Sequence, residues 1–312
     1  DVYGNPNSVI NSTEDGTSVT FDNSKPSLSS VSIKSSNQDT TFAKVGDTIT
    51  IIFKADEVLT GQIASINSNN TEITSITEGL LTKYYAKYVM ENTDNEGEIN
   101  FEIIVTDSIG IQSNPVTETT NNSLVTFDRT QPVISNLHIE SDNNYNTSVG
   151  ISGDEIYLTF TSSEILLLDS VVAIISGAEV PVNLNDGVYQ GVYQLTGLEP
   201  SGNITYTIDY QDLASNPGTQ LDSTQDGSFV EHDLTPPEII NSYISSDNPD
   251  SSWAKSGDSV FVTFVSSEPL NNINLTIANV VSDYVQVNPT KYVGYQLMTL
   301  DIEQGVLPFS LT

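Results

Sequence analysis

An internal repeat constrains the fold of this chain more than any other feature of its sequence. The stretch TFVSSEPL (263–270) has counterparts in TFTSSEIL (159–166) and IFKADEVL (52–59), at intervals of 104 and 107 residues. The chain is therefore predicted to consist of units of about 105 residues. Further landmarks recur in the same order: FDNSKP, FDRTQP and HDLTPP from 21, 127 and 232, AKVGD, GISGD and AKSGD from 43, 150 and 254, and GEINFEIIVTD and GNITYTIDYQD from 97 and 202.

The two ends of the chain are predicted to be out of register with this repeat. Residues 1–22 match the tail of a unit, 212–233, and GVLPFSLT (305–312) stops where the third unit would continue into its next loop. We therefore expect a closing strand of a preceding unit at 1–22, complete domains at 23–127 and 128–232, and at 233–312 a domain lacking its last strand. This pattern fits a window of a longer array, and a complete subunit is the alternative.

Within each unit the sequence has the periodicity of β-strands. DTITIIF (47–53), DEIYLTF (154–160) and DSVFVTF (258–264) alternate with period two and favour Val, Ile, Thr, Tyr and Phe. About seven such short strands, separated by Gly, Pro, Asn and Asp turns, are typical of an immunoglobulin-like sandwich. The predicted fold class is all-β, with tandem immunoglobulin-like β-sandwich domains arranged as an extended rod.

Charge and composition exclude several classes of partner. The formal net charge is −32, from 9 basic and 41 acidic residues. Nucleic acids and anionic membrane surfaces both require clustered Lys and Arg, so neither is an expected partner. The chain has no cysteine, which excludes disulfides and thiolate metal sites. No apolar stretch reaches the roughly 18 residues of a membrane span, so the chain is not expected to be membrane-embedded.

Four short motifs carry a resemblance to a known family. The patterns D-x-T-x-P-x-I, A-K-x-G-D-x-V, S-E-x-L and T-D-x-x-x-N resemble the bacterial, cadherin-like immunoglobulin repeats of giant cell-surface adhesins. The first unit departs from them, with ADE in place of SSE and DSIGIQSN in place of DLASN. The resemblance implies a non-catalytic extracellular rod that is often stiffened by calcium and carries its binding tip elsewhere.

Recurring acidic residues are predicted to converge at each domain junction. In immunoglobulin topology, the strand before the S-E motif and the strand before the T-D motif both end at the pole where the linker enters. Gathered carboxylates repel one another unless a cation lies among them, and hard oxygen ligands suit Ca²⁺. The candidate calcium ligands are Asp22, Glu57 and Asp107 at the first junction, Asp128, Glu164 and Asp212 at the second, and Asp233 and Glu268 at the third.

The alternative for these acidic residues is that they only cap turns, because Asp before Thr-x-Pro commonly forms an Asx-turn. Asp47, Asp154 and Asp258 lie at the opposite pole, in the G-D turns, and turn capping is the favoured interpretation there.

No catalytic arrangement is evident. His138 and His232 occupy non-equivalent places, and neither neighbours a Ser or Cys arranged as a nucleophile. A pair of carboxylates could hydrolyse glycosides, but every acidic pair here recurs by unit, which fits a structural role better. The chain is therefore not expected to be an enzyme.

The leading functional hypothesis is a structural spacer of a long extracellular adhesin or surface fibre, whose partners are neighbouring domains of the same protein. One alternative is a glycan- or protein-binding module, which would present an aromatic platform. Another is a filament subunit that assembles head to tail by strand complementation, because an incomplete sandwich exposes a strand edge. The chain has N-x-S/T sequons at Asn11, Asn69, Asn121, Asn146, Asn203 and Asn274, and in a secretory eukaryotic source many of them should carry glycans.

Overall fold

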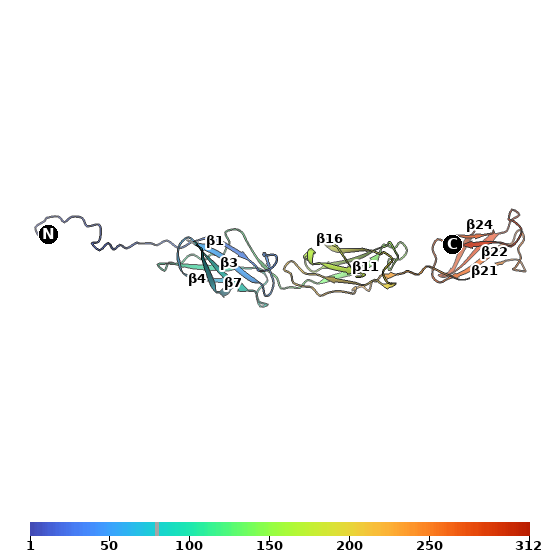
Figure 1. Cartoon of the computed structure of the whole chain (residues 1–312), viewed down its shortest axis with the longest axis horizontal. Coiled ribbons are helices and arrows are strands. Elements are labelled where there is room, and N and C mark those ends of the chain that lie inside the picture. Colours follow the sequence, from blue (N-terminus) through green and yellow to red (C-terminus); the bar gives the residue numbers. More distant parts are fainter. Residues whose placement is uncertain (79–80) are drawn as a thin grey trace. The chain divides into compact units, whose positions relative to one another are not determined.

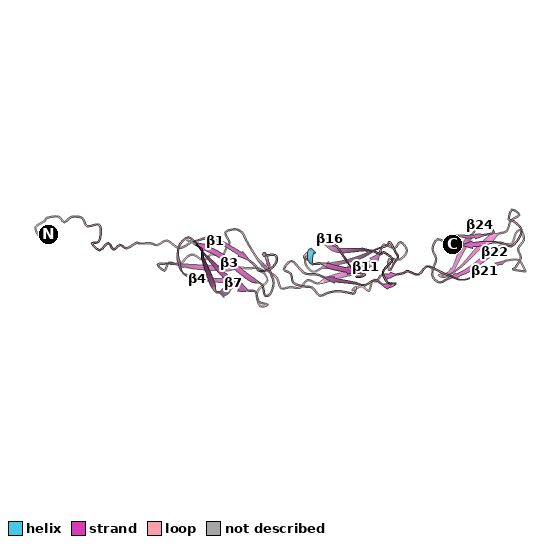
Figure 2. Cartoon of the chain, in the orientation of Figure 1, coloured by secondary structure: helices cyan, strands magenta, loops and turns pink. Residues whose placement is uncertain are grey.

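The computed structural model describes residues 1–78 and 81–312, and its regular structure is almost entirely β (Figure 1). The one helical element in the described residues is a single 3₁₀ turn, η1 (Leu168–Ser170) (Figure 2). The predicted all-β fold class is confirmed. The described part of the chain contains no helix with the length and apolar character of a membrane span.

The chain divides into two compact units, Asp1–His232 and Asp233–Thr312, and the first unit contains two β-sandwiches. In the first sandwich a four-stranded sheet, β1-β3-β7-β6, faces the sheet β5-β4-β9, and a short sheet β2-β10-β8 closes one end. Its strands are β1 (Leu28–Lys34), β2 (Phe42–Ala43), β3 (Thr48–Ala55), β4 (Leu59–Ile66), β5 (Asn69–Thr71), β6 (Ile73–Glu78), β7 (Leu81–Val89), β8 (Gly97–Glu98), β9 (Phe101–Asp107) and β10 (Thr126–Phe127).

The second sandwich repeats this strand order. Its four-stranded sheet is β11-β13-β17-β16, the facing sheet is β15-β14-β19, and the short sheet is β12-β20-β18. Its strands are β11 (Ile134–Ser141), β12 (Val149–Gly150), β13 (Glu155–Ser162), β14 (Val172–Ile175), β15 (Ala178–Val180), β16 (Val182–Asn185), β17 (Val188–Gln194), β18 (Gly202–Asn203), β19 (Tyr206–Asp209) and β20 (Glu231–His232).

The third sandwich, in the second unit, repeats the two main sheets. They are β21-β22-β26-β25 and β24-β23-β27, and the described residues of this unit form no counterpart of the short closing sheet. Its strands are β21 (Ile239–Ser246), β22 (Ser259–Ser266), β23 (Leu275–Ile277), β24 (Val280–Val281), β25 (Asp283–Asn288), β26 (Lys291–Leu297) and β27 (Phe309–Leu311).

Each sandwich has its own hydrophobic core, built from the alternating strands that the sequence predicted. The core clusters draw their residues from 31–127, 134–230 and 260–298. Along β3 and β13 buried side chains alternate with partly exposed ones, as period two requires, and β22 follows the same alternation except that Thr263 is buried as well.

A stacked aromatic pair recurs at the centre of each core. Phe160 stacks on Tyr189 with ring centroids 5.2 Å apart, and Phe53–Tyr84 and Phe264–Tyr292 repeat the same separation. The recurring tyrosines of the sequence therefore fill the core at one position per unit.

Residues 1–22 belong to no strand, and their apolar side chains are exposed. A strand is stabilised by ladder hydrogen bonds to a neighbouring backbone, and none runs beside this segment. The expectation that 1–22 is the closing strand of another unit therefore stays a prediction.

Candidate metal centre

Three carboxylates meet where the second sandwich begins. Asp128, Glu164 and Asp212 each offer one oxygen, and these oxygens all lie within 4.8 Å of one another. Within residues 1–78 and 81–312 this is the one group of three or more acidic, His or Cys side chains close enough to hold a metal ion. The three side chains come from the linker, the segment after β13 and the loop after β19.

Backbone pairing brings Glu164 and Asp212 together. Leu166, two residues after Glu164, forms an isolated antiparallel bridge with Asp212, and the adjoining N–H of Leu167 donates to the Gln211 carbonyl at 2.9 Å. The hydroxyl of Tyr189, which lies in the core, accepts the Leu166 N–H at 3.0 Å. The S-E-x-L segment is thus fixed on one side by the core and on the other by the T-D loop.

Asp212 is buried and is oriented by Asn216, the last residue of its own motif. Asn216 donates its N–H to Asp212 Oδ1 at 2.8 Å and its side-chain amide to Oδ2 at 2.9 Å. The same amide donates to the Asp128 carbonyl at 3.1 Å, so Asn216 ties the loop to the linker. Burial raises the pKa of Asp212, the Asn216 hydrogen bonds lower it, and Asp128 raises it, with a net increase.

Asp128 enters the site directly after β10. Its N–H donates to the Ala43 carbonyl at 2.9 Å, and its Oδ1 accepts the Thr130 N–H at 2.9 Å. Asp22 and Asp233 accept the N–H two residues on in the same way, so the predicted Asx-turn is present in all three linkers. This turn uses one carboxylate oxygen, which leaves the second oxygen available as a ligand.

Glu164 is the least well compensated carboxylate of the group. Its Oε1 is buried and has no hydrogen-bond partner, although a carboxylate removed from water requires one. Burial, together with the negative charges of Asp128, Asp212 and Glu96, raises its pKa to about 6. These carboxylates form an all-oxygen donor set, which is the chemistry that Ca²⁺ prefers.

The other two junctions contain parts of the same arrangement. In the first, burial and the charges of Asp107, Asp56 and Asp22 raise the pKa of Glu57, so these acids lie near one another without forming a group of three within 4.8 Å. Asp107 is buried, and its Oδ2 has no hydrogen-bond partner.

In the third sandwich Asp233 and Glu268 are present, but 233–312 contains no counterpart of Asp212. The sequence already separated these cases in part, because ADE replaces SSE in the first unit and only two acidic candidates were predicted for the third.

The acids at the opposite pole cap turns, as expected. Asp154 Oδ2 accepts the Ile151 N–H at 3.0 Å and the Asn143 side-chain amide at 2.8 Å. Asp47 and Asp258 make the equivalent pair of bonds. The glycines before these three Asp residues have φ of 92°, 99° and 97°, the left-handed region that favours glycine and explains the recurring G-D pair.

The two histidines lie in different environments. His138 is partly exposed on β11, and its Nδ1 lies 2.6 Å from Asp226 Oδ2. His232 is buried on β20, with Nδ1 3.2 Å from the Pro200 carbonyl. Both occupy strand positions, and neither lies in the carboxylate group.

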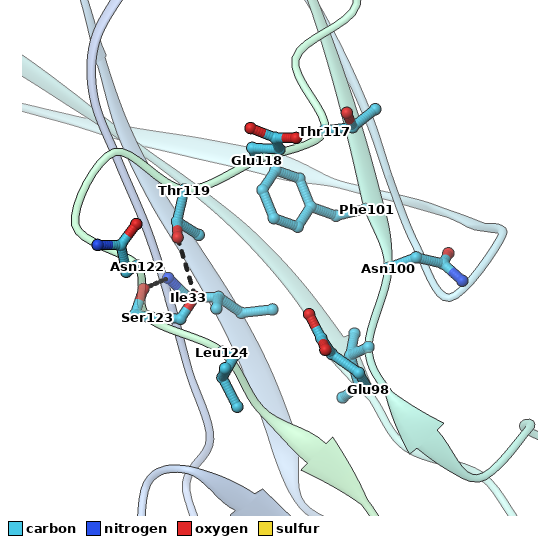
Figure 3. A pocket seen from close by; sticks show the side chains of 11 residues that line it. Ile33, Glu98, Asn100, Phe101, Thr117, Glu118, Thr119, Asn122, Ser123 and Leu124 are labelled. Atoms are coloured by element: carbon cyan, nitrogen blue, oxygen red, sulfur yellow. Dashed lines mark hydrogen bonds between the residues drawn. The ribbon is translucent and has the colours of Figure 1, made fainter.

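A polar pocket of about 510 Å³ lies in the first sandwich (Figure 3). Its walls carry the carboxylates of Glu98 and Glu118, and its one aromatic residue, Phe101, is buried. The aromatic platform expected of a glycan-binding module is therefore not formed here, and the tyrosines of the core pairs are buried as well.

Five of the six sequon asparagines are exposed. Asn69 differs, because it is half-buried and its side-chain amide donates to Asp94 at 3.1 Å.

The raised pKa of Glu164 predicts an unusual pH dependence for the calcium-free protein. The folded state holds the proton of Glu164 more tightly than the unfolded state does. Protonated Glu164 therefore contributes stability below about pH 4.5, and this contribution is lost as the pH rises through about 6. In chelator, we expect Glu164→Gln to raise the free energy of unfolding by about 1 kcal/mol near pH 8 and by little at acidic pH.

Thermal unfolding of both proteins across this pH range measures the effect, and Glu179→Gln, an exposed carboxylate of the same sandwich, is the control. An equal difference at both ends of the range would contradict the prediction.

No protein-family model and no curated protein sequence matches the chain. Among solved structures, the chain is similar to fibronectin(III)-like modules of Clostridium thermocellum CbhA, with 14% identity, a TM-score of 0.33 and coverage of 65% of this chain and 92% of that one. It is also similar to the I9–I11 tandem of titin (8% identity, TM-score 0.33, coverage 87% and 90%). The Dpr2 Ig1-Ig2 complex with DIP-Theta Ig1-Ig3 is a further match (10% identity, TM-score 0.28, coverage 92% and 98%). These similarities are too low to bear on function, and the observed strand order identifies the chain as tandem immunoglobulin-like β-sandwiches.

Proposed function

We propose that this chain is a non-catalytic structural spacer of an extracellular or cell-surface protein, in which calcium stiffens a junction between sandwiches. The observation that carries the proposal is the group of Asp128, Glu164 and Asp212, with oxygens within 4.8 Å and a buried Glu164 oxygen that lacks a partner. Three repeated cores, each entered through a linker that begins with aspartate, fit a chain whose task is to extend, and the partners of each sandwich are its neighbours in series.

Calcium at this group would act on the linker. Asp128 follows the last strand of the first sandwich, whereas Glu164 and Asp212 belong to the second. An ion bound by all three would restrict the linker while leaving both cores unchanged. Backbone carbonyls and water supply the remaining oxygens of the six to eight that Ca²⁺ takes.

Isothermal titration of the metal-stripped protein with CaCl₂ tests the proposal. The wild type should bind calcium, and Glu164→Gln should weaken the tightest site by at least about tenfold, because one charged ligand is lost. Glu179→Gln removes an exposed carboxylate from the same sandwich, outside the group, and is the matched control. Equal calcium affinities in the wild type and Glu164→Gln would contradict a calcium site at this group.

The spacer role has a separate measurement. Small-angle scattering with and without chelator should show a wider range of dimensions when calcium is removed, while circular dichroism retains its β-signal. An unchanged scattering profile would show that a bound ion does not stiffen the junction.

The binding-module alternative has less support. The recurring core tyrosines are buried and the pocket in the first sandwich is acidic and polar, so the exposed aromatic residues Tyr243, Tyr284 and Tyr295 of the third sandwich are what this alternative would use. A negative result on a glycan array is the expected outcome.

A further inference from the structure

A polar contact outside the carboxylate group joins the first two sandwiches, which belong to one compact unit. The side-chain amide of Asn37, in the loop after β1, donates to the Ala214 carbonyl at 2.8 Å. The ammonium of Lys44, directly after β2, donates to the Ser215 carbonyl at 2.7 Å. Both acceptors lie in the loop 212–216, which follows β19 of the second sandwich and also supplies one carboxylate to the candidate metal centre.

The burial of Ala214 indicates that this contact excludes water. Ala214 is 0% exposed, although it is not part of the hydrophobic core of the second sandwich. Asn37 is 8% exposed. A backbone carbonyl that is removed from water requires a hydrogen-bond donor, and the Asn37 amide supplies one. The contact is therefore part of a packed junction and not a solvated surface pair.

Asp47 positions both donors of the first sandwich. Its Oδ2 accepts the Lys44 N–H at 2.8 Å and one hydrogen of the Asn37 amide at 2.9 Å. The other hydrogen of that amide is then directed at the Ala214 carbonyl. The aspartate that caps this turn thus also fixes the geometry of the contact.

The equivalent turns of the other two sandwiches differ at the lysine position. In the second sandwich Ile151 takes the place of Lys44, so its turn has no ammonium. In the third, Lys255 is present and exposed, whereas Lys44 is partly buried. Asn248 there donates to Asp258 Oδ2 at 2.8 Å, as Asn37 does to its own aspartate. The third sandwich therefore offers a matched control for substitutions in the first.

The linker between the first two sandwiches is anchored to the first of them. The Asp128 N–H donates to the Ala43 carbonyl at 2.9 Å, and the Thr130 hydroxyl donates to Glu96 Oε1 at 2.9 Å. Because this part of the linker is held by the first sandwich, the second sandwich can rotate only about the residues that follow. Such a rotation would pull the loop 212–216 away from its two donors.

We propose that Asn37 and Lys44 form a docking surface for the loop 212–216 and limit the rotation of the second sandwich against the first without an ion. The bond from the Lys44 ammonium is charge-assisted and therefore stronger than a bond between neutral groups. The contact needs no calcium, so it stands or fails separately from the proposed metal site. An ion bound at that site would restrain the same loop from the linker side, and the two restraints would add.

Distances between spin labels, measured in EDTA, test the contact. Lys87→Cys and Asn183→Cys place one label on an exposed position of each of the first two sandwiches, in a chain that otherwise lacks cysteine. The labelled wild type should give a narrower distance distribution than the same protein carrying Asn37→Ala and Lys44→Met. This double variant removes both donors, while methionine retains much of the apolar stem of lysine.

The matched control makes the same two changes in the third sandwich, as Asn248→Ala with Lys255→Met. It should leave the distance distribution unchanged. Because Asn37→Ala also removes a bond within its own turn, the single variant Lys44→Met is measured as well. It should widen the distribution in the same direction as the double variant.

Hydrogen exchange provides a readout in the sandwich that was not substituted. In EDTA, the amides of 213–218 should exchange roughly tenfold faster in the double variant, because their loop loses a hydrogen bond from a charged donor. Strand β13 should retain its protection, since both substitutions lie outside the second core.

Three results would overturn the proposal: a wild-type distribution in EDTA as wide as that of the double variant, equal widening in the third-sandwich control, or unchanged exchange of 213–218. No calcium is present in these experiments, so none of the results depends on the metal site.

Discussion

Replacing Phe160 with alanine is expected to lower the free energy of unfolding of the second sandwich by about 3–5 kcal/mol. Phe160 is 1% exposed and stacks on Tyr189, so alanine leaves a cavity that the facing sheets cannot fill. The loss extends to the candidate metal centre, because the Tyr189 hydroxyl holds the backbone of Leu166 beside Asp212.

Calorimetry of the whole chain measures this effect, since each sandwich has a separate core and one transition should move. Ile165→Ala, at an exposed side chain of the same sandwich, is the matched control and should change the transition little. A Phe160→Ala protein that retained every transition of the wild type would show that the stacked pair contributes little to the core.

The fold followed from the sequence because its two strongest signals are local. Alternation in 154–160 and its counterparts places one face of each strand in a core, and the constant spacing of the G-D and S-E motifs repeats that strand three times. The short closing strands β10 and β20 are two residues each and have no periodicity of their own. Their positions became clear only from their pairing with the neighbouring strands.

The candidate site was predicted by topology and completed by details that spacing cannot show. Because the segments after β13 and β19 end at the pole where the linker enters, Glu164 and Asp212 were expected beside Asp128. The roles of Tyr189 and Asn216 were not predicted, although the D-x-x-x-N spacing of 212–216 was already visible in the sequence.

The burial of one Glu164 oxygen depends on packing and could not be read from composition. Three acidic candidates were predicted at each of the first two junctions, and only the second brings three carboxylates within 4.8 Å. The longer loop after Asp107 changes the first junction, and the third has no aspartate equivalent to Asp212 within 233–312.

Calcium should reverse the order of stability between the wild type and Glu164→Gln. At about 100 times its Kd, an ion that binds only the folded state adds about 2.7 kcal/mol to the free energy of unfolding. Near pH 8 in chelator the wild type has three gathered carboxylates without a cation, so the glutamine variant should be the more stable of the two. In calcium the wild type gains the binding free energy, whereas the variant, with a ligand lost, gains much less.

The calorimetric transition that Phe160→Ala lowers identifies the second sandwich, and the two proteins are compared at that transition with and without calcium. A crossing of the two stabilities requires both like-charge repulsion in the free site and an ion that relieves it. If Glu164 served only the turn between β13 and β14, the variant would differ from the wild type by the same amount in both conditions. Parallel shifts would therefore remove calcium from the junction. The linker would then be held by protein hydrogen bonds, which include those of Asn216 and the Asp128 turn and those of Asn37 and Lys44 to the 214–215 carbonyls.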